Sequence, residues 1–175
     1  MFIAFLIGSI ITKELMEQNI EVGERREVFQ QARGYADSVR KKLLVVGAPK
    51  DLPWGENHPA GDVTIDISPN IDSKHEYKVA DVRKIPYPAG TFGAAYISHV
   101  LEHLPTIDDA AKALNELHRV ADRVFVVSPH KSSVSAWLHP EHHLWVTPSG
   151  DGYVIEQRGV DTTKKASYVV SMEIV

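Results

Sequence analysis

Two histidines with a glutamate between them stand in the middle of the chain, in "SHVLEHL" at residues 98–104. Imidazoles and carboxylates serve as general bases in enzymes, and both are common ligands of zinc. Histidines four residues apart share one face only on a continuous helix, whereas the apolar run "FGAAYIS" predicts that His99 follows a strand. The spacing therefore argues against a metal site shared by these two histidines. It leaves open whether His99 is a ligand, a catalyst or simply the end of a strand, and we expect His103 to pack or to cap a turn.

More histidines follow in "HPEHH" at residues 139–143. The main expectation is that the chain holds no metal. A site that combines His99 and His103 with His139, His142 or His143 remains an alternative, because imidazoles bind metals well. The segment is otherwise interpreted as a substrate-side loop or a solvated turn.

Five short apolar runs predict the strands that position these side chains. Two-sided runs such as "LLVV" are typical of buried parallel strands. The predicted strands are Lys42–Val46, Val63–Ile67, Tyr77–Ala80, Ala94–Ile97 and Val124–Val127. A helix capped by Thr106 and running to Val120 precedes the fifth strand, and "YVIEQR" and "SYVVSMEIV" predict a closing hairpin. The fold class that follows is α/β: an open, mainly parallel Rossmann-like sheet with helices on both faces and an antiparallel edge.

Polar side chains stand where three of these strands end. In open α/β sheets, ligands bind beyond the carboxyl ends of the strands. Asp66 ends the second strand, Asp81 follows the third, and Ser98 and His99 follow the fourth. Asp66 is placed to accept hydrogen bonds from ribose hydroxyls, and Asp81 could accept one from an adenine amine. The alternative for each aspartate is a simple turn cap.

Three pieces in order, "VTIDISPN", "VADVRKIPYPAGTFGAAYISHVLEHLP" and "ALNELHRVADRVFVVSP", carry a specific resemblance. Together they resemble the class I S-adenosylmethionine-dependent methyltransferases, over roughly Lys41 to Pro129. The resemblance implies that Asp66 binds the ribose, that Asp81 and Val82 bind the adenine, and that Ser98 and His99 line the methionine end. The expected cofactor-binding residues are Gly47, Asp66, Ile67, Asp81, Val82, Ser98 and His99.

The activity that the resemblance implies is methyl transfer from S-adenosylmethionine to an unknown acceptor, either a small molecule or a surface-presented group. Such a displacement depends mainly on positioning, so the protein needs no nucleophile of its own. The candidates for a base toward a hydroxyl or amine acceptor are His99, His130 and Tyr96, and the sequence does not choose among them.

One departure from the family pattern concerns the loop after the first strand. In "LLVVGAPKDLPWG" only Gly47 remains of the usual glycines, with Val45 where an acid is expected. Pro49 and Asp51 replace the later glycines, and a proline removes a backbone donor and fixes φ. A non-catalytic methyltransferase-like module for binding or assembly, without cofactor binding, is therefore the alternative function.

The composition limits the kinds of partner and the location, and the N-terminal pattern indicates how the chain is divided. The net charge of −4 gives no basic footprint for nucleic acid, and the absence of cysteine excludes disulfides and leaves cytoplasm as the default location. The sequence divides into a helical segment, residues 1–40, and a methyltransferase-like domain, residues 41–175. From residue 14 onward the expected apolar face of the helix consists of Leu15, Val22, Phe29, Ala32, Tyr35 and Val39.

The first residues, "MFIAFLIGSIIT", form an uncharged stretch that ends before Lys13. A spanning helix needs about 20 apolar residues, so this stretch is too short to cross a membrane. We expect residues 1–12 to pack against a second copy of the chain or a partner protein. A membrane surface is the weaker alternative, because no lysine or arginine precedes the stretch to attract anionic lipid.

Overall fold

A five-stranded parallel sheet forms the centre of the computed structural model, which describes residues 2–47, 60–69, 76–150, 152–159 and 165–168. The strand order is β3-β2-β1-β4-β5, and every neighbouring pair runs parallel. The predicted open parallel Rossmann-like sheet, with its first strand in the centre, is confirmed. The bounds of the five strands are β1 Lys42–Val46, β2 Val63–Asp66, β3 Glu76–Val79, β4 Phe92–Ser98 and β5 Ala121–Val127.

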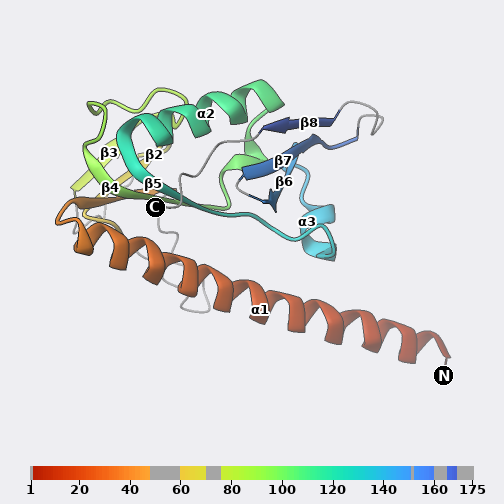
Figure 1. The fold of residues 1–175 in the computed structure, drawn as a ribbon. Coiled ribbons are helices and arrows are strands. Elements are labelled where there is room, and N and C mark those ends of the chain that lie inside the picture. The colour runs from red at the N-terminus through yellow and green to blue at the C-terminus, as the bar shows by residue number, and fades with distance from the viewer. Residues whose placement is uncertain (1, 48–59, 70–75, 151, 160–164, 169–175) are drawn as a thin grey trace.

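The central strands are apolar on both faces because each face meets a different layer. In β1, Leu43 and Val45 pack toward the helix α1, whereas Leu44 and Val46 join the cluster that contains α2. Figure 1 shows these two helices on opposite sides of the sheet. The helices on both faces that the sequence predicts are therefore present, and β4 is buried along its whole length.

Helix α1 (Phe2–Ser38) is continuous over 37 residues and begins well before residue 14. Its contact with the sheet is made by Ala32 and Ala36, both fully buried, with Val28 and Phe29 beside them. The predicted apolar face was wrong at its two ends, because Leu15 is 55% and Val39 is 37% exposed. None of the helices in the described ranges is both long and apolar enough to cross a membrane.

Helix α2 (Ile107–Val120) covers the other face and leads directly into β5. The predicted cap is confirmed: Thr106 accepts a hydrogen bond from the backbone N–H of Asp109, at 3.1 Å. Leu114 and Leu117 are fully buried in the core between α2 and the sheet. The threonine cap determines where α2 begins, and the apolar stripe determines which face of α2 packs on the sheet.

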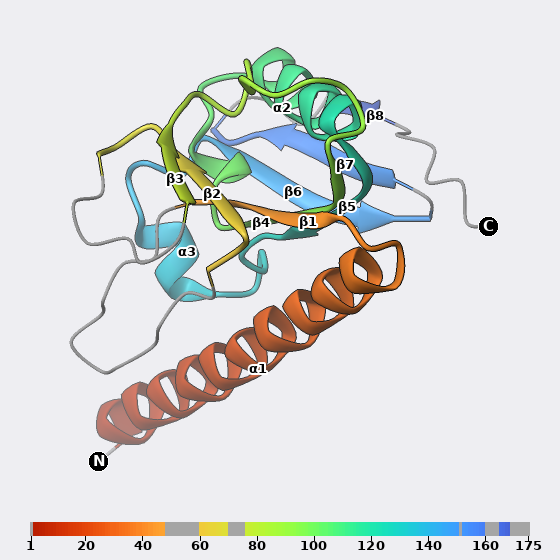
Figure 2. The ribbon, with the colours of Figure 1, turned by 90° about the vertical axis from the view of Figure 1, so that its left-hand side faces the viewer.

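The antiparallel strands lie in a sheet of their own and do not extend the parallel sheet. The sheet consists of β6 (Leu144–Ser149), β7 (Gly152–Gln157) and β8 (Lys165–Tyr168). The predicted hairpin corresponds to β7 and to β8, which begins two residues earlier than expected, in the predicted turn. Residues 169–175 of its second strand lie outside the described residues, and β6 was not predicted. Figure 2 shows this sheet on the side that carries α2. It lies there because its apolar side chains complete the core on that face, namely Leu144, Val146, Tyr153 and Ile155.

Two short helices connect these layers. The 3-10 helix η1 (Leu101–His103) follows β4, and α3 (Val134–Leu138) lies between β5 and β6. The backbone N–H of His143 donates to the carbonyl oxygen of Glu102 at 2.7 Å, so the turn after α3 is attached to η1. Both helices therefore flank the end of β4, where the sequence predicted functional residues.

Candidate functional site

The ends of β1, β2 and β4 meet at one side of the sheet, which we call the carboxyl edge and which includes Gly47, Asp66, Ser98 and His99. The register explains this, because Val46 pairs with both Ile65 and Ile97 in the neighbouring strands. Four of the predicted cofactor-binding residues therefore come together here, although their roles toward a cofactor stay predictions.

Gly47 occupies a position that only glycine adopts without strain. Its φ is +106°, in a region that side chains disfavour. A Cβ atom at this position would lie 3.2 Å from a methyl group of Val100. The turn after β1 therefore passes close to the end of β4, and this one remaining glycine of the family loop has a clear structural reason.

His99 lies between two carboxyl groups that come from different elements. Its Nε2 atom is 3.4 Å from Oε1 of Glu21 on α1, and its Nδ1 atom is 3.5 Å from Oε1 of Glu102 on η1. The backbone of His99 has a φ of +54°, which is rare for a residue with a side chain. Its N–H donates to the carbonyl oxygen of Val127 in β5 at 3.0 Å, which fixes this turn.

Both carboxyl groups beside His99 are buried. Glu102 is only 1% exposed, and neither of its carboxyl oxygens has a hydrogen-bond partner in another described residue. Burial raises the pKa of Glu102 to about 8, so this carboxyl is mostly protonated at neutral pH. Burial also raises the pKa of Glu21, while the nearby charge of Arg25 lowers it. The site therefore holds two acidic groups with raised pKa values, of which that of Glu102 lies near neutral pH.

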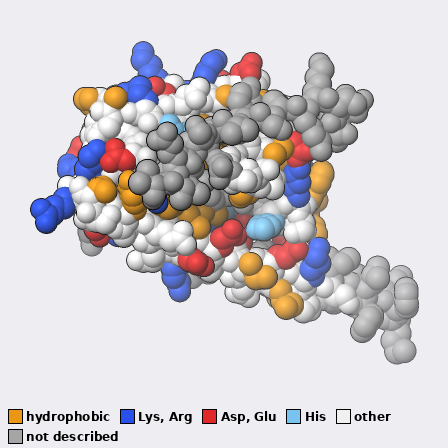
Figure 3. All heavy atoms as spheres, in the orientation of Figure 1, with side chains coloured by type: hydrophobic (Ala, Val, Ile, Leu, Met, Phe, Trp, Pro, Cys, Tyr) orange, Lys and Arg blue, Asp and Glu red, His pale blue; other side chains and the backbone are white. Residues whose placement is uncertain are grey.

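Glu21 belongs to a row of glutamates on one face of α1, consisting of Glu14, Glu17, Glu21 and Glu24. We call the part of α1 that carries this row its acidic half. Glu24 lies 3.3 Å from Nε2 of His130, and both side chains of this pair are exposed. In Figure 3, acidic side chains and a histidine gather where α1 meets the body of the protein. The acidic half thus faces the carboxyl edge and the segment that follows β5.

Glu14 joins the acidic half to α3. Its carboxylate accepts hydrogen bonds from the backbone N–H groups of Val134 and Ser135, both at 2.9 Å, and from the hydroxyl of Ser133 at 3.2 Å. Burial acts to raise the pKa of Glu14, but these hydrogen bonds outweigh it and the pKa is lowered. A negative charge at the start of α3 also complements the unpaired N–H groups there.

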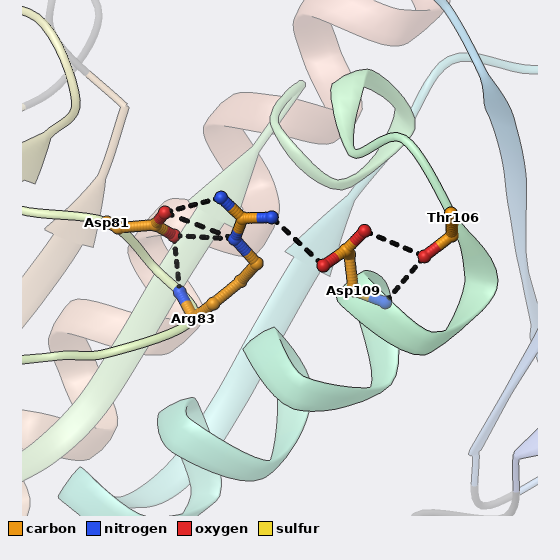
Figure 4. Close-up of polar contacts among 4 residues, drawn as sticks. All are labelled: Asp81, Arg83, Thr106 and Asp109. Atoms are coloured by element: carbon orange, nitrogen blue, oxygen red, sulfur yellow. Dashed lines mark hydrogen bonds and ion pairs between the residues drawn. The ribbon is translucent and has the colours of Figure 1, made fainter.

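Asp81, the residue expected at the adenine, is part of an ion-pair network (Figure 4). Arg83 donates to both carboxylate oxygens of Asp81, with distances of 2.6 Å from Nη2 and 3.0 Å from Nε. A second branch of the same guanidinium donates to Asp109 of α2 at 2.9 Å. The Arg83 hydrogen bonds lower the pKa of Asp81. An adenine amine would therefore compete with Arg83 for this carboxylate.

The remaining predicted residues differ in their surroundings. Asp66 accepts a hydrogen bond from the backbone N–H of Ser68 at 2.7 Å, the local turn that the simpler interpretation expects. Ile67 is 71% exposed, whereas Val82 is buried in the core. Pro49 and Asp51, in the loop that departs from the family pattern, lie outside the described residues.

The three candidate bases are now distinguishable. Tyr96 is buried beneath α1, where its hydroxyl donates to the carbonyl oxygen of Arg25 at 3.2 Å, and burial raises its pKa. His130 is exposed and pairs with Glu24. Only His99 lies at the carboxyl edge between two buried carboxyl groups.

The sequence reasoning missed Glu21 and treated Glu102 as a family feature without a role. A signal for Glu21 was present, because Glu14, Glu17, Glu21 and Glu24 recur at the three- and four-residue spacing of one helix face. That spacing continues into Val28, Ala32 and Ala36, which pack on the sheet. No sequence pattern around Glu102 predicts its burial, since only the packing of η1 determines that its side chain is buried.

The fold and the carboxyl edge define an α/β protein of the Rossmann-like class with its site beyond the strand ends. A family model described as a methyltransferase domain matches residues 60–123, which include Asp66, Asp81, Ser98 and His99. This match supports, over the residues that it covers, the resemblance to the class I S-adenosylmethionine-dependent methyltransferases.

One solved structure with a similar course of the chain is that of Burkholderia thailandensis 1,6-didemethyltoxoflavin-N1-methyltransferase with bound 1,6-didemethyltoxoflavin and S-adenosylhomocysteine. The sequences are 8% identical, the TM-score is 0.39, and the match covers 90% of this chain and 68% of that one. No curated protein matches the chain in sequence. The strand order and pairing, and not this distant likeness, establish the fold.

Proposed function

We propose that the protein is an S-adenosylmethionine-dependent methyltransferase that acts on a small or surface-presented acceptor. The observation that carries this proposal is the position of His99, at the carboxyl edge of a methyltransferase-type sheet and between the carboxyl groups of Glu21 and Glu102. The end of the fourth strand is where the family resemblance assigns the methionine end of the cofactor.

The residues of the carboxyl edge fit the cationic end of this cofactor. S-adenosylmethionine carries a sulfonium and an ammonium group, and buried carboxyl groups without hydrogen-bond partners favour a ligand with positive charge or donors. The family's acid on the first strand is replaced here by Val45, which packs toward α1. Glu21, contributed by α1, supplies a carboxyl group beside the same strand ends. Asp66 would hold the ribose hydroxyls.

His99 is the residue that the geometry favours as a base for the acceptor. The cofactor, when bound, would supply a sulfonium methyl group to an acceptor atom that attacks the methyl carbon in line, and the sulfur would leave as a neutral thioether. An imidazole beside two carboxyl groups can take the proton that a hydroxyl or amine acceptor releases. The neutral carboxyl of Glu102 would orient the ring, and Glu21, when ionised, would stabilise its charged form. Arg25 covers Tyr96 together with the part of α1 that carries Phe29, Ala32 and Ala36, which we call its apolar half. This cover keeps the Tyr96 hydroxyl out of the reaction.

The second candidate function is a non-catalytic module for binding or assembly. The observation that favours it is the network of Asp81 with Arg83, which already uses both oxygens of the carboxylate expected at the adenine. A domain that keeps the sheet but satisfies its own binding residues internally would have no use for the cofactor.

Calorimetric titration with S-adenosylmethionine and S-adenosylhomocysteine separates the two functions. We expect both compounds to bind the full chain, and we expect Asp66→Ala to weaken binding by about 1.5–3 kcal/mol through loss of a charge-assisted hydrogen bond. Asp37→Ala is the matched control, because Asp37 is an exposed aspartate at the far end of α1. If neither compound binds at millimolar concentration, the catalytic proposal fails and the non-catalytic module stands.

A further inference from the structure

Three histidines from two separate segments meet beside η1. His103 is the last residue of η1, and His139 and His142 lie in the turn after α3. One ring nitrogen from each histidine lies within 4.8 Å of the others. The ring centroids of His103 and His142 are 4.8 Å apart, and those of His139 and His142 are 4.4 Å apart. His99 takes no part in this group, since it lies between Glu21 and Glu102.

The surroundings of His103 fix the form of its ring. Its Nδ1 atom lies 3.2 Å from the carbonyl oxygen of Glu141, in the turn that carries the other two histidines. A proton on Nδ1 makes this contact a hydrogen bond and places the lone pair of the ring on Nε2. Histidines that bind metals commonly hold their second ring nitrogen in this way.

His142 is the buried member of the group. Its side chain is 8% exposed, and its Nδ1 atom has no hydrogen-bond partner among the residues that the structure describes. A buried ring nitrogen without a partner is a position that a bound ion can satisfy.

The backbone of the turn is fixed by other contacts. Arg158 directly follows β7. Its guanidinium donates to the carbonyl oxygens of His139 at 2.7 Å and His142 at 3.2 Å, and also to that of Trp137. The N–H of His143 donates to the carbonyl oxygen of Glu102. The turn and η1 are therefore held together by the backbone, and the three imidazoles need only side-chain rotations to converge.

We propose that His103, His139 and His142 bind one divalent transition-metal ion, with zinc as the best fit. Tetrahedral zinc with bonds of about 2.0–2.1 Å to nitrogen brings its ligand atoms to roughly 3.4 Å from one another. His139 is exposed, so its ring can turn away from the stack on His142 and close this distance. A set of three neutral imidazoles without a carboxylate suits zinc, copper or nickel and not magnesium or calcium.

The ion would connect η1 to the turn after α3, and water would fill the fourth position. Because His103 directly follows Glu102, the ion would also stabilise the segment that holds this carboxyl group against His99. The positive charge of Arg158 nearby opposes a cation, so we expect an affinity in the micromolar range. This site is independent of cofactor binding at the carboxyl edge.

The test is a zinc titration of the untagged full chain after treatment with a chelator, in competition with a chromophoric chelator. We expect one ion per chain, and a loss of affinity by more than about tenfold in His139→Ala. His143→Ala is the matched control, because His143 is an exposed histidine of the same turn outside the group. Its affinity should equal that of the unchanged chain.

Thermal unfolding gives a second readout that does not depend on the competitor. Zinc should raise the Tm of the unchanged chain and of His143→Ala but not that of His139→Ala, and magnesium should raise none of them. Because His139 is exposed, its replacement leaves the fold intact, which circular dichroism checks. The proposal is overturned if the unchanged chain binds no zinc, or if His143→Ala loses as much affinity as His139→Ala.

Discussion

The two halves of α1 present the same helical face to very different surroundings. In the apolar half, Ala32 and Ala36 are fully buried against β1 and β4, and Phe29 packs edge-on against Tyr96 with ring centroids 5.4 Å apart. In the acidic half, Glu14 and Glu21 take the equivalent positions and contact α3 and His99. The change from alanine to glutamate occurs where the helix passes the end of the sheet.

This difference teaches that one periodic stripe can serve two purposes. The apolar half stabilises the domain by removing surface from water, whereas the acidic half includes the buried carboxyl group of Glu21, which costs stability. Natural chains accept such a cost where a site needs it. The predictions below test whether the two halves differ in this way, beginning with the largest expected effect.

The largest effect concerns the buried carboxyl of Glu102, which the acidic half faces. Its pKa rises from 4.5 to about 8 on folding, so between these values the folded state binds more protons than the unfolded state. The free energy of unfolding therefore falls as the pH rises through this window. Glu102→Gln has no carboxyl group to protonate, so it lacks this pH dependence. The free energy of unfolding of the variant, minus that of the unchanged chain, should therefore rise by on the order of 3 kcal/mol from pH 5 to pH 8.

Urea unfolding at several pH values measures this difference. Glu27→Gln is the control, because Glu27 is an exposed glutamate on α1 whose carboxylate accepts a hydrogen bond from Gln31. A difference between Glu102→Gln and the unchanged chain that stays constant from pH 5 to pH 8 would show that this carboxyl is not protonated on folding.

The second effect concerns the tight contact between β4 and the end of the apolar half. A Cβ atom on Gly93 would lie 2.7 Å from a methyl group of Val39 and 3.0 Å from Cα of Ala36. Gly93→Ala should therefore destabilise the fold by about 1–3 kcal/mol, because helix and strand must separate. Gly34→Ala, on the exposed side of the same helix with open space around it, should stabilise by about 0.5–1 kcal/mol. Equal urea midpoints for the two variants would contradict the described packing.

The third effect concerns the contact between the acidic half and α3. Glu14→Gln removes the charge that accepts hydrogen bonds from the first N–H groups of α3. We expect a loss of about 0.5–1 kcal/mol, the usual value of a helix cap at the surface. Glu27→Gln serves again as the matched change on an exposed face. Hydrogen exchange of the α3 amides should rise only in Glu14→Gln, and unchanged exchange would exclude this role.

The smallest effect on the fold is expected for the first twelve residues, which lead beyond the rest of the molecule in Figure 1. Three apolar side chains on the next part of α1 are exposed: Leu15 at 55%, Met16 at 61% and Ile20 at 63%. We propose that this end of the helix pairs with a second copy of the chain. Deletion of residues 1–12 should leave the circular dichroism of the sheet unchanged and lower the mass in light scattering. A full-length chain that is already monomeric, with or without liposomes, would contradict this proposal.

Local patterns were sufficient to predict the parallel sheet. The run "KLLVV" matches β1 residue for residue, because a strand covered on both faces has no polar alternation and is easily recognised. The strand β6 was missed, since its first half is buried and its second half, Thr147–Ser149, is exposed and contains a proline. A strand that is half core and half surface shows neither a continuous apolar run nor a clean alternation.

The candidate site could be predicted only in part. Asp66 and His99 follow recognisable strands, so their edge was predictable from the strand order. The partners of His99 were not, because Glu21 is 78 positions earlier in the chain and only the crossing of α1 over the sheet brings it near. The hydrogen bonds from Arg83 to Asp81 also could not be predicted, although the two residues are close in sequence. An aspartate two residues before an arginine does not reveal which ligand it prefers.

The length of α1 has a mechanical consequence. At 1.5 Å per residue its 37 residues span roughly 55 Å, about three times the length of a five-residue strand. The helix contacts the rest of the protein at two separate points, through Ala32 on the sheet and through Glu14 on α3, and Glu21 lies between them. If the support at Glu14 is released, a tilt of about 5° about Ala32 displaces Glu21, roughly 16 Å away, by more than about 1 Å. That is the scale on which catalytic geometry is lost, so the contact between Glu14 and α3 would help to hold Glu21 at its distance from His99.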